Sequence, residues 1–174
     1  MKGLIHIYTG RGKGKTTAAM GLAVRCAGSG GRVLVTQMLK KGTSSEISVL
    51  RQVPEIRVFS LEKHEQFVSR MTPEEKQEAG RYHQAYFQQI CEMTGAEHWD
   101  LLILDEIIGA VNHGFLTAGQ VAAFLRGRPE DLEVVMTGRD PLPELTELAD
   151  YITEMKKVKH PFENGIRARK GIEF

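Results

Sequence analysis

A glycine- and lysine-rich stretch near the start of the chain constrains the fold more than any other part of the 174 residues. Residues 9–17 read TGRGKGKTT, between an apolar run at residues 3–8 and a helical pattern at residues 16–28. Glycines let the backbone curl so that its N–H groups face an anion, and a helix N-terminus adds partial positive charge. Lys15 adds a full charge, and Thr16 has the position of a magnesium ligand. The stretch predicts a phosphate-binding loop, with Thr9 standing where the strict motif has its first glycine.

A second stretch, at residues 101–106, reads LLILDE. An apolar strand that ends in two carboxylates is typical of the Walker B arrangement, which holds a metal ion beside bound phosphates. Many buried strands end in acidic residues, so this pattern indicates a metal site only in combination with the phosphate loop. Together the two stretches predict that Asp105 and Glu106 lie near Thr16.

Short apolar runs alternate with helical patterns along the chain, which predicts an α/β fold. Capping boxes at residues 72–75 (TPEE) and 117–120 (TAGQ) mark the starts of two helices. We expect a mostly parallel sheet with helices on both faces, of the P-loop NTPase (RecA-like) type, as a single domain over residues 1–174. Residues 40–45 and 61–71 read as polar loops near the strand ends. The expected strands are residues 3–8, 32–37, 56–60, 100–104, 132–137 and 151–155.

The long helix after residue 72 has an apolar stripe that includes Tyr82 and Tyr86, so both are expected in the core. His83 is expected on the surface of the same helix. The two cysteines, Cys26 and Cys91, form no metal-binding spacing and are expected to be half-buried thiols in a reducing compartment.

The composition is that of an ordinary globular protein with a net charge of +1, which does not indicate a nucleic-acid-coating protein. No segment approaches the ~18 consecutive apolar residues of a membrane span. The apolar run at the start is too short for a signal peptide. We therefore expect a cytoplasmic protein with no membrane or nucleic-acid partner.

The residues alone indicate an enzyme that uses a magnesium–nucleotide complex. A GTPase would need an Asn-Lys-x-Asp motif, which the sequence lacks. A small-molecule kinase would need an arginine-bearing lid, for which Arg70 and Arg81 lie in the right region without further support. An ATPase could use Glu106 to orient water. Phosphoryl transfer by an ATPase or kinase, and a non-catalytic binding module, stay open at this point.

Several stretches of the chain together resemble the ATP:corrinoid adenosyltransferases of the phosphate-loop type. They are residues 9–19, 35–40, 104–107, 137–139, 148–155, 159–162 and 171–174, with Gly165 and Ala168. The resemblance implies transfer of the 5′-deoxyadenosyl group of ATP to the cobalt of a reduced corrinoid, with release of triphosphate. It also implies ATP, Mg²⁺ and a cobalamin-type corrinoid as ligands, a flavoprotein as reductant, and a homodimer.

The resemblance further implies roles for individual residues. Lys15, Thr16 and Glu106 would be catalytic, and Thr16 and Glu106 would bind Mg²⁺ with Asp105 supporting them. His160, in the tail, is a weaker candidate for the site. The residues expected to bind ATP are Thr9, Gly10, Arg11, Gly12, Lys13, Gly14, Lys15, Thr16, Thr17, Arg25, Gln37 and Arg139.

Some features depart from the family pattern. Arg11 stands where the loop usually has asparagine. The sequence begins a few residues before the first expected strand, so the N-terminal helix that longer members place over the partner's corrinoid site is not expected. Phe67 is the one aromatic residue in the stretch where those members have an aromatic pair, and Trp99 lies too close to the Walker B strand to substitute. Cobalamin, cobinamide and cobyrinic acid a,c-diamide stay open as corrinoid substrates.

Overall fold

The computed structural model describes residues 2–39, 44–61 and 68–173. Six strands form one sheet in the order β3-β2-β4-β5-β1-β6, and every neighbouring pair is parallel. The predicted parallel α/β fold of the P-loop NTPase type is confirmed. The strands are β1 (Ile5–Thr9), β2 (Val33–Gln37), β3 (Ile56–Ser60), β4 (Leu101–Asp105), β5 (Glu133–Thr137) and β6 (Tyr151–Glu154).

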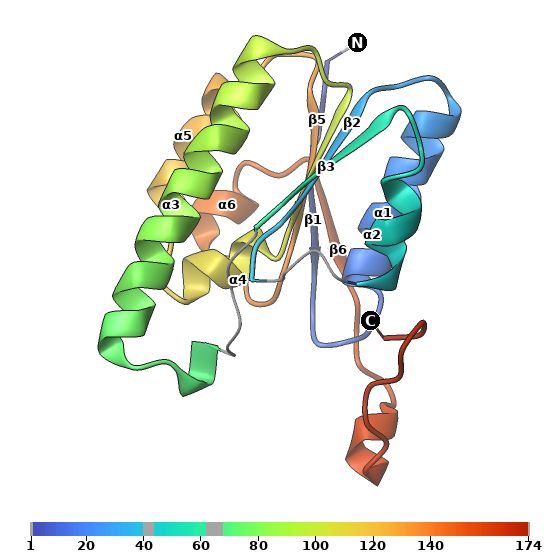
Figure 1. Cartoon of the computed structure of the whole chain (residues 1–174), viewed down its shortest axis with the longest axis vertical. Coiled ribbons are helices and arrows are strands. Elements are labelled where there is room, and N and C mark those ends of the chain that lie inside the picture. The colour runs from blue at the N-terminus through green and yellow to red at the C-terminus, as the bar shows by residue number, and fades with distance from the viewer. Residues whose placement is uncertain (1, 40–43, 62–67, 174) are drawn as a thin grey trace.

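Helices cover both faces of the sheet, as Figure 1 shows, with α1 and α2 on one side and α3 to α6 on the other. Two short 3-10 helices, η1 (Val68–Arg70) and η2 (Pro161–Asn164), precede α3 and follow β6. None of the helices in the described ranges is long and apolar enough to span a membrane. The α-helices are α1 (Lys15–Gly28), α2 (Ser45–Leu50), α3 (Pro73–Ala96), α4 (Ile107–Asn112), α5 (Ala118–Gly127) and α6 (Pro143–Thr146).

The central strands are buried on both faces, which explains why they read as continuous apolar runs. All five residues of β2 and all five of β4 are buried. Successive side chains point to opposite faces, so Leu34 joins the core cluster under α3 to α5 while Val35 joins the cluster under α1 and α2. The sheet is therefore a rigid platform between two separate apolar cores.

Both predicted capping boxes are present. The Thr72 hydroxyl accepts from the Glu75 N–H at 3.2 Å, and the Glu75 carboxylate accepts from the Thr72 N–H at 2.7 Å. Thr117 and Gln120 make the same reciprocal pair at the start of α5. Each box satisfies N–H groups that the first helical turn leaves without a partner, so these two helix starts could be located from sequence.

The expectation for His83 is wrong, because this side chain is fully buried in α3. Its ring stacks on Phe115 at 4.8 Å, and Nδ1 lies 2.8 Å from the Ala79 carbonyl oxygen. Tyr86 is buried as predicted, and Tyr82 packs against the same core while partly exposed. Both cysteines are half-buried free thiols, as expected.

The two expected loops are only partly covered by the described residues. Residues 40–43 and 62–67, including Phe67, lie outside them. In the described part, Ser45 is the first residue of α2 and residues 68–70 form η1, so neither stretch is loop throughout.

The carboxyl ends of all six parallel strands meet at one edge of the sheet, where ligands bind in this class of fold. The phosphate loop leaves this edge from β1, and β5 separates β1 from β4. Three polar residues end the neighbouring strands, Gln37 on β2, Asp105 on β4 and Thr137 on β5. The fold therefore gathers them beside the loop.

Candidate active site

The phosphate loop between β1 and α1 is closed by its own lysine. Gly10 and Gly14 have φ of 96° and 118°, a region that glycine enters without steric cost. Lys15 opens α1 and is only 9% exposed. Its Nζ donates to the carbonyl oxygens of Gly10 at 2.6 Å and of Gly12 at 2.9 Å. A full positive charge is thus fixed against the loop at a helix N-terminus, where an anion is stabilised.

The segment after β6 packs directly onto this loop. The Met155 N–H donates to the Thr9 carbonyl oxygen at 2.8 Å, and the Gly12 N–H donates to the Met155 carbonyl oxygen. A Cβ at Gly10 or Gly12 would lie 2.6 or 2.5 Å from that same oxygen. The two glycines are therefore required by the approach of the tail. The expectation that successive N–H groups all face a phosphate does not hold for Gly12.

Asp105 is the centre of a buried hydrogen-bond cluster that joins four elements. The Thr16 hydroxyl of α1 donates to Oδ1 at 2.9 Å, and the Thr137 hydroxyl of β5 donates to the same oxygen at 2.7 Å. Gln37 Nε2 of β2 donates to Oδ2 at 3.0 Å. Gln37 and Asp105 are direct register partners on adjacent strands, which explains this contact. The structure brings the two halves of the predicted site together at Thr16 and Asp105.

Glu106 follows Asp105 with an unusual backbone conformation. Its φ is 59°, a left-handed value that non-glycine residues adopt at a cost of about 1–3 kcal/mol. Its N–H donates to the Thr137 hydroxyl oxygen at 2.9 Å. A Cβ on Gly109 would lie 3.2 Å from Glu106 Oε2, so the carboxylate lies over the first turn of α4. This backbone turn directs the carboxylate away from the line of β4.

Gln37 carries a buried acceptor that needs a partner. The side chain is fully buried, and among the described residues Oε1 has no hydrogen-bond donor. Leaving a buried polar atom unpaired costs about 1–3 kcal/mol. Because Nε2 is held by Asp105, Oε1 is placed at the same carboxyl edge, where a ligand or a bound water can donate to it.

The predicted arginines differ in their distance from this cluster. Arg139 follows β5 at the carboxyl edge with an exposed side chain, and its carbonyl oxygen accepts from Asn112 Nδ2 at 2.8 Å. Arg11 is exposed on the loop, 3.8 Å from the Asp140 carboxylate. Arg25 lies ten residues beyond Lys15 on α1, about 15 Å along the helix axis. The structure therefore does not bring Arg25 to the loop.

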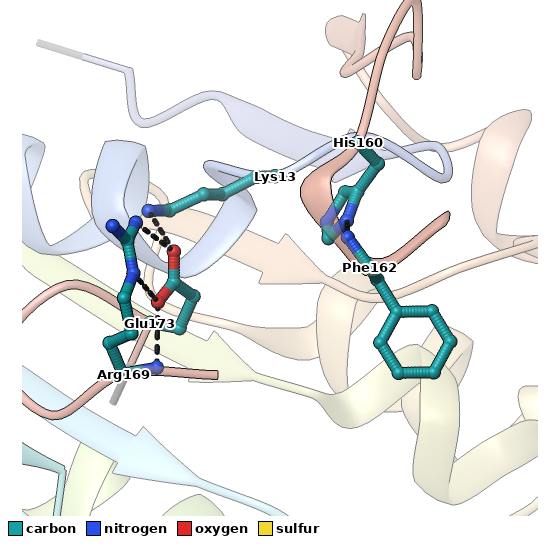
Figure 2. Close-up of polar contacts among 5 residues, drawn as sticks. All are labelled: Lys13, His160, Phe162, Arg169 and Glu173. Atoms are coloured by element: carbon teal, nitrogen blue, oxygen red, sulfur yellow. Dashed lines mark hydrogen bonds and ion pairs between the residues drawn. The ribbon is translucent and has the colours of Figure 1, made fainter. Parts of the chain in front are cut away.

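Other predicted residues lie in the loop itself. Thr17 is an exposed position of the first turn of α1, and the Lys13 side chain is 48% exposed and bonded to the C-terminal tail. His160 caps η2, where Nδ1 accepts from the Phe162 N–H at 3.2 Å (Figure 2).

Sequence reasoning did not assign Thr137 a place in the site, although its hydroxyl bonds both Asp105 and the Glu106 backbone. The available signal was its position at the end of the strand before the Gly138 turn. The β1–β5 register pairs Tyr8 with Thr137, which puts Thr137 next to the start of the phosphate loop.

Comparison with known proteins agrees with the nucleotide site that the geometry indicates. The sequence model of "ATP:corrinoid adenosyltransferase BtuR/CobO/CobP" matches residues 1–174. The chain belongs to this family. It is 34% identical to the corrinoid adenosyltransferase of Pseudomonas aeruginosa, over 99% of the chain and 84% of that protein. It is also 34% identical to the corrinoid adenosyltransferase of Escherichia coli K12 and to that named CobA of Salmonella typhimurium, over 99% of the chain and 86% of each. Membership in the adenosyltransferase family confirms the resemblance inferred from the sequence.

Proposed function

We propose that this protein transfers the 5′-deoxyadenosyl group of ATP to the cobalt of a reduced corrinoid, acting as one domain over residues 1–174. The observation that carries the proposal is the match of residues 1–174 to the ATP:corrinoid adenosyltransferase family. The 2.9 Å bond from Thr16 to Asp105 supports it, because it joins the phosphate loop to the acidic strand end in one nucleotide site. The full-length match to corrinoid adenosyltransferases supports the reaction type over phosphoryl transfer.

The reaction requires the protein to stabilise a leaving group. The electron pair of the Co(I) centre attacks the 5′ carbon of ATP, the bond from that carbon to oxygen breaks, and triphosphate leaves with the bonding pair. A cobalt–carbon bond forms, and cobalt becomes formally Co(III). Lys15 and the N–H groups of the loop that are free to face the phosphates would offset the charge on the leaving triphosphate. Holding the triphosphate also fixes the direction in which the 5′ carbon faces the corrinoid.

The residues at the carboxyl edge suit Mg²⁺, an ion that prefers oxygen ligands and keeps several waters. Thr16 and Glu106 would hold it, and Asp105 orients the Thr16 hydroxyl. The buried Gln37 Oε1 is an acceptor suited to a water on such an ion. When bound, Mg²⁺ supplies positive charge that screens the triphosphate.

Further parts of the proposal rest on family membership. We propose a cytoplasmic homodimer that receives its corrinoid in reduced form from a flavoprotein. Arg139 and Arg11 are proposed to contact ATP from the segment after β5 and from the phosphate loop, and Gln37 from the end of β2. Arg25 has weaker support because of its distance along α1.

An anaerobic assay tests the reaction type. The protein is mixed with Mg·ATP and chemically reduced cobalamin, the visible spectrum is followed, and the phosphate product is identified. We expect a light-sensitive adenosylcobalamin spectrum together with inorganic triphosphate, and no product from Lys15→Ala. Formation of ADP without a cobalt–carbon product would instead assign the protein to the ATPase or kinase class. A repeat with cobinamide separates the choice of corrinoid from the choice of reaction.

A further inference from the structure

The tail after β6 meets the phosphate loop at both of its ends. Met155, at its start, pairs with Thr9 and Gly12. Glu173, at its far end, accepts a hydrogen bond from Lys13 Nζ at 3.1 Å, across 160 positions of sequence. Figure 2 shows this carboxylate between Lys13 and Arg169, with Phe162 on another part of the tail. The segment between the two anchors projects from the body of the protein (Figure 1).

The Glu173 carboxylate is held from the tail side by three donors of one residue. The N–H, Nε and Nη2 of Arg169 donate to it at 2.8, 3.2 and 3.1 Å. These hydrogen bonds, first of all that from the Arg169 side chain, lower the pKa of Glu173 to about 2. Glu173 is therefore ionised at neutral pH. A permanent anion is attached to a lysine of the phosphate loop.

Lys13 is in reach of two kinds of anion. Its ammonium group offers three donors, and phosphate oxygens and carboxylate oxygens are equivalent acceptors for them. Because the Lys13 side chain is 48% exposed, its pair with Glu173 is in contact with solvent and weak enough to exchange. The rest of the tail attracts anions, since residues 155–173 contain six basic and two acidic side chains. Glu173 is thus a single negative charge directed at the loop from a positively charged segment.

An adenosyltransferase has a particular need for such a charge. A loop that stabilises triphosphate as it leaves also binds the released product, and slow release of product limits kcat in many enzymes. An internal anion that competes for one loop lysine weakens the hold on the product. The tail, fixed at Met155, keeps that anion next to the loop throughout.

We propose that Glu173 competes with triphosphate for Lys13 and so promotes release of the triphosphate product. The inference rests on the proposed function, because that function makes triphosphate a product. It assigns to the tail a part in turnover, exerted through a lysine that the phosphates of ATP would also contact.

Binding of inorganic triphosphate with Mg²⁺, measured by titration calorimetry without corrinoid, tests this inference. We expect Glu173→Gln to bind triphosphate about three- to fivefold more tightly than the wild-type protein, the scale of one exposed ion pair. Lys13→Met should bind it more weakly, and adding Glu173→Gln to Lys13→Met should give no further gain. In steady-state assays, Glu173→Gln should show stronger inhibition by triphosphate and a lower kcat.

Glu163→Gln is the matched control, since Glu163 forms an ion pair with Lys157 in the same tail but does not contact the loop. Its triphosphate affinity should equal that of the wild-type protein.

An equal gain in affinity in Glu163→Gln, or on adding Glu173→Gln to Lys13→Met, would reduce the effect to overall charge and overturn the inference. Unchanged or weaker binding by a folded Glu173→Gln, checked by thermal unfolding, would also overturn it, as would a wild-type protein that binds no triphosphate. A protein that shows these affinity differences but forms no adenosylcorrinoid would refute the proposed function alone.

Discussion

The Thr137 hydroxyl lies 2.7 Å from Asp105 Oδ1 and donates its hydrogen to that oxygen. The same hydroxyl oxygen accepts the backbone N–H of Glu106 at 2.9 Å. One side chain at the end of β5 therefore fixes both carboxylates of the acidic pair, Asp105 through its side chain and Glu106 through its backbone. Because β5 lies between β1 and β4, this contact also bridges the strand that carries the phosphate loop and the strand that carries the acids.

Thr137→Val keeps the shape of the side chain and removes both hydrogen bonds. We expect a loss of about 1–3 kcal/mol in the free energy of unfolding, because the substitution removes the acceptor of the Glu106 N–H and one of the two hydrogen bonds that Asp105 Oδ1 accepts from hydroxyl groups. Urea unfolding measures this loss. Thr137→Ser is the control, since it restores the hydroxyl and should recover most of the stability. A Thr137→Val protein as stable as the wild-type protein would show that water replaces the hydroxyl at this position.

Glu106→Ala tests whether the carboxylate binds the metal ion. Alanine at φ 59° keeps the left-handed backbone cost, so the variant removes the carboxylate without relieving strain. We expect the Mg²⁺ concentration for half-maximal activity to rise about tenfold or more. Glu106→Gln, which keeps the size but not the charge, should show a similar shift. A Mg²⁺ titration that superimposes on the wild-type curve would remove Glu106 from the metal ligands.

The positions in the fold that could be predicted from the sequence are those that follow from local rules. Lys15 and Thr16 are placed by the helix that begins at the loop, and Asp105 by the end of a buried strand. Parallel strands end at one edge, so Thr16 and Asp105 could be expected to meet. The capping boxes at Thr72 and Thr117 are equally local.

The residues that sequence missed depend on contacts between distant segments. Thr137 gains its role from the strand order, which no single stretch reveals. The burial of His83 depends on Phe115 packing against α3 from elsewhere in the chain. Gly10 and Gly12 read as phosphate-binding glycines, while the structure shows that Met155 also requires them.

Gly12→Ala tests the contact between the tail and the loop. Gly12 has no positive φ, so the effect of a methyl group here is steric, at 2.5 Å from the Met155 carbonyl oxygen. We expect a loss of about 1–3 kcal/mol in the free energy of unfolding and faster proteolysis of the tail. Gly21→Ala is the control, because nothing lies within 4 Å of a Cβ at this position of α1. It should stabilise the protein by about 0.4–1 kcal/mol. Equal stability of the two variants would mean that the tail moves aside at no cost.

Arg139→Ala tests whether the exposed arginine after β5 contacts ATP. Its side chain is outside the core, so the variant should fold with unchanged stability. We expect the KM for ATP to rise about tenfold, since a hydrogen bond to a charged group contributes about 1.5–3 kcal/mol. The KM for the corrinoid should change much less.

Arg126→Ala is the control, because Arg126 is an exposed arginine in the last turn of α5. This variant should leave both KM values unchanged. Equal losses for ATP and corrinoid in Arg139→Ala would indicate that Arg139 shapes the turn that Asn112 holds and does not bind the nucleotide.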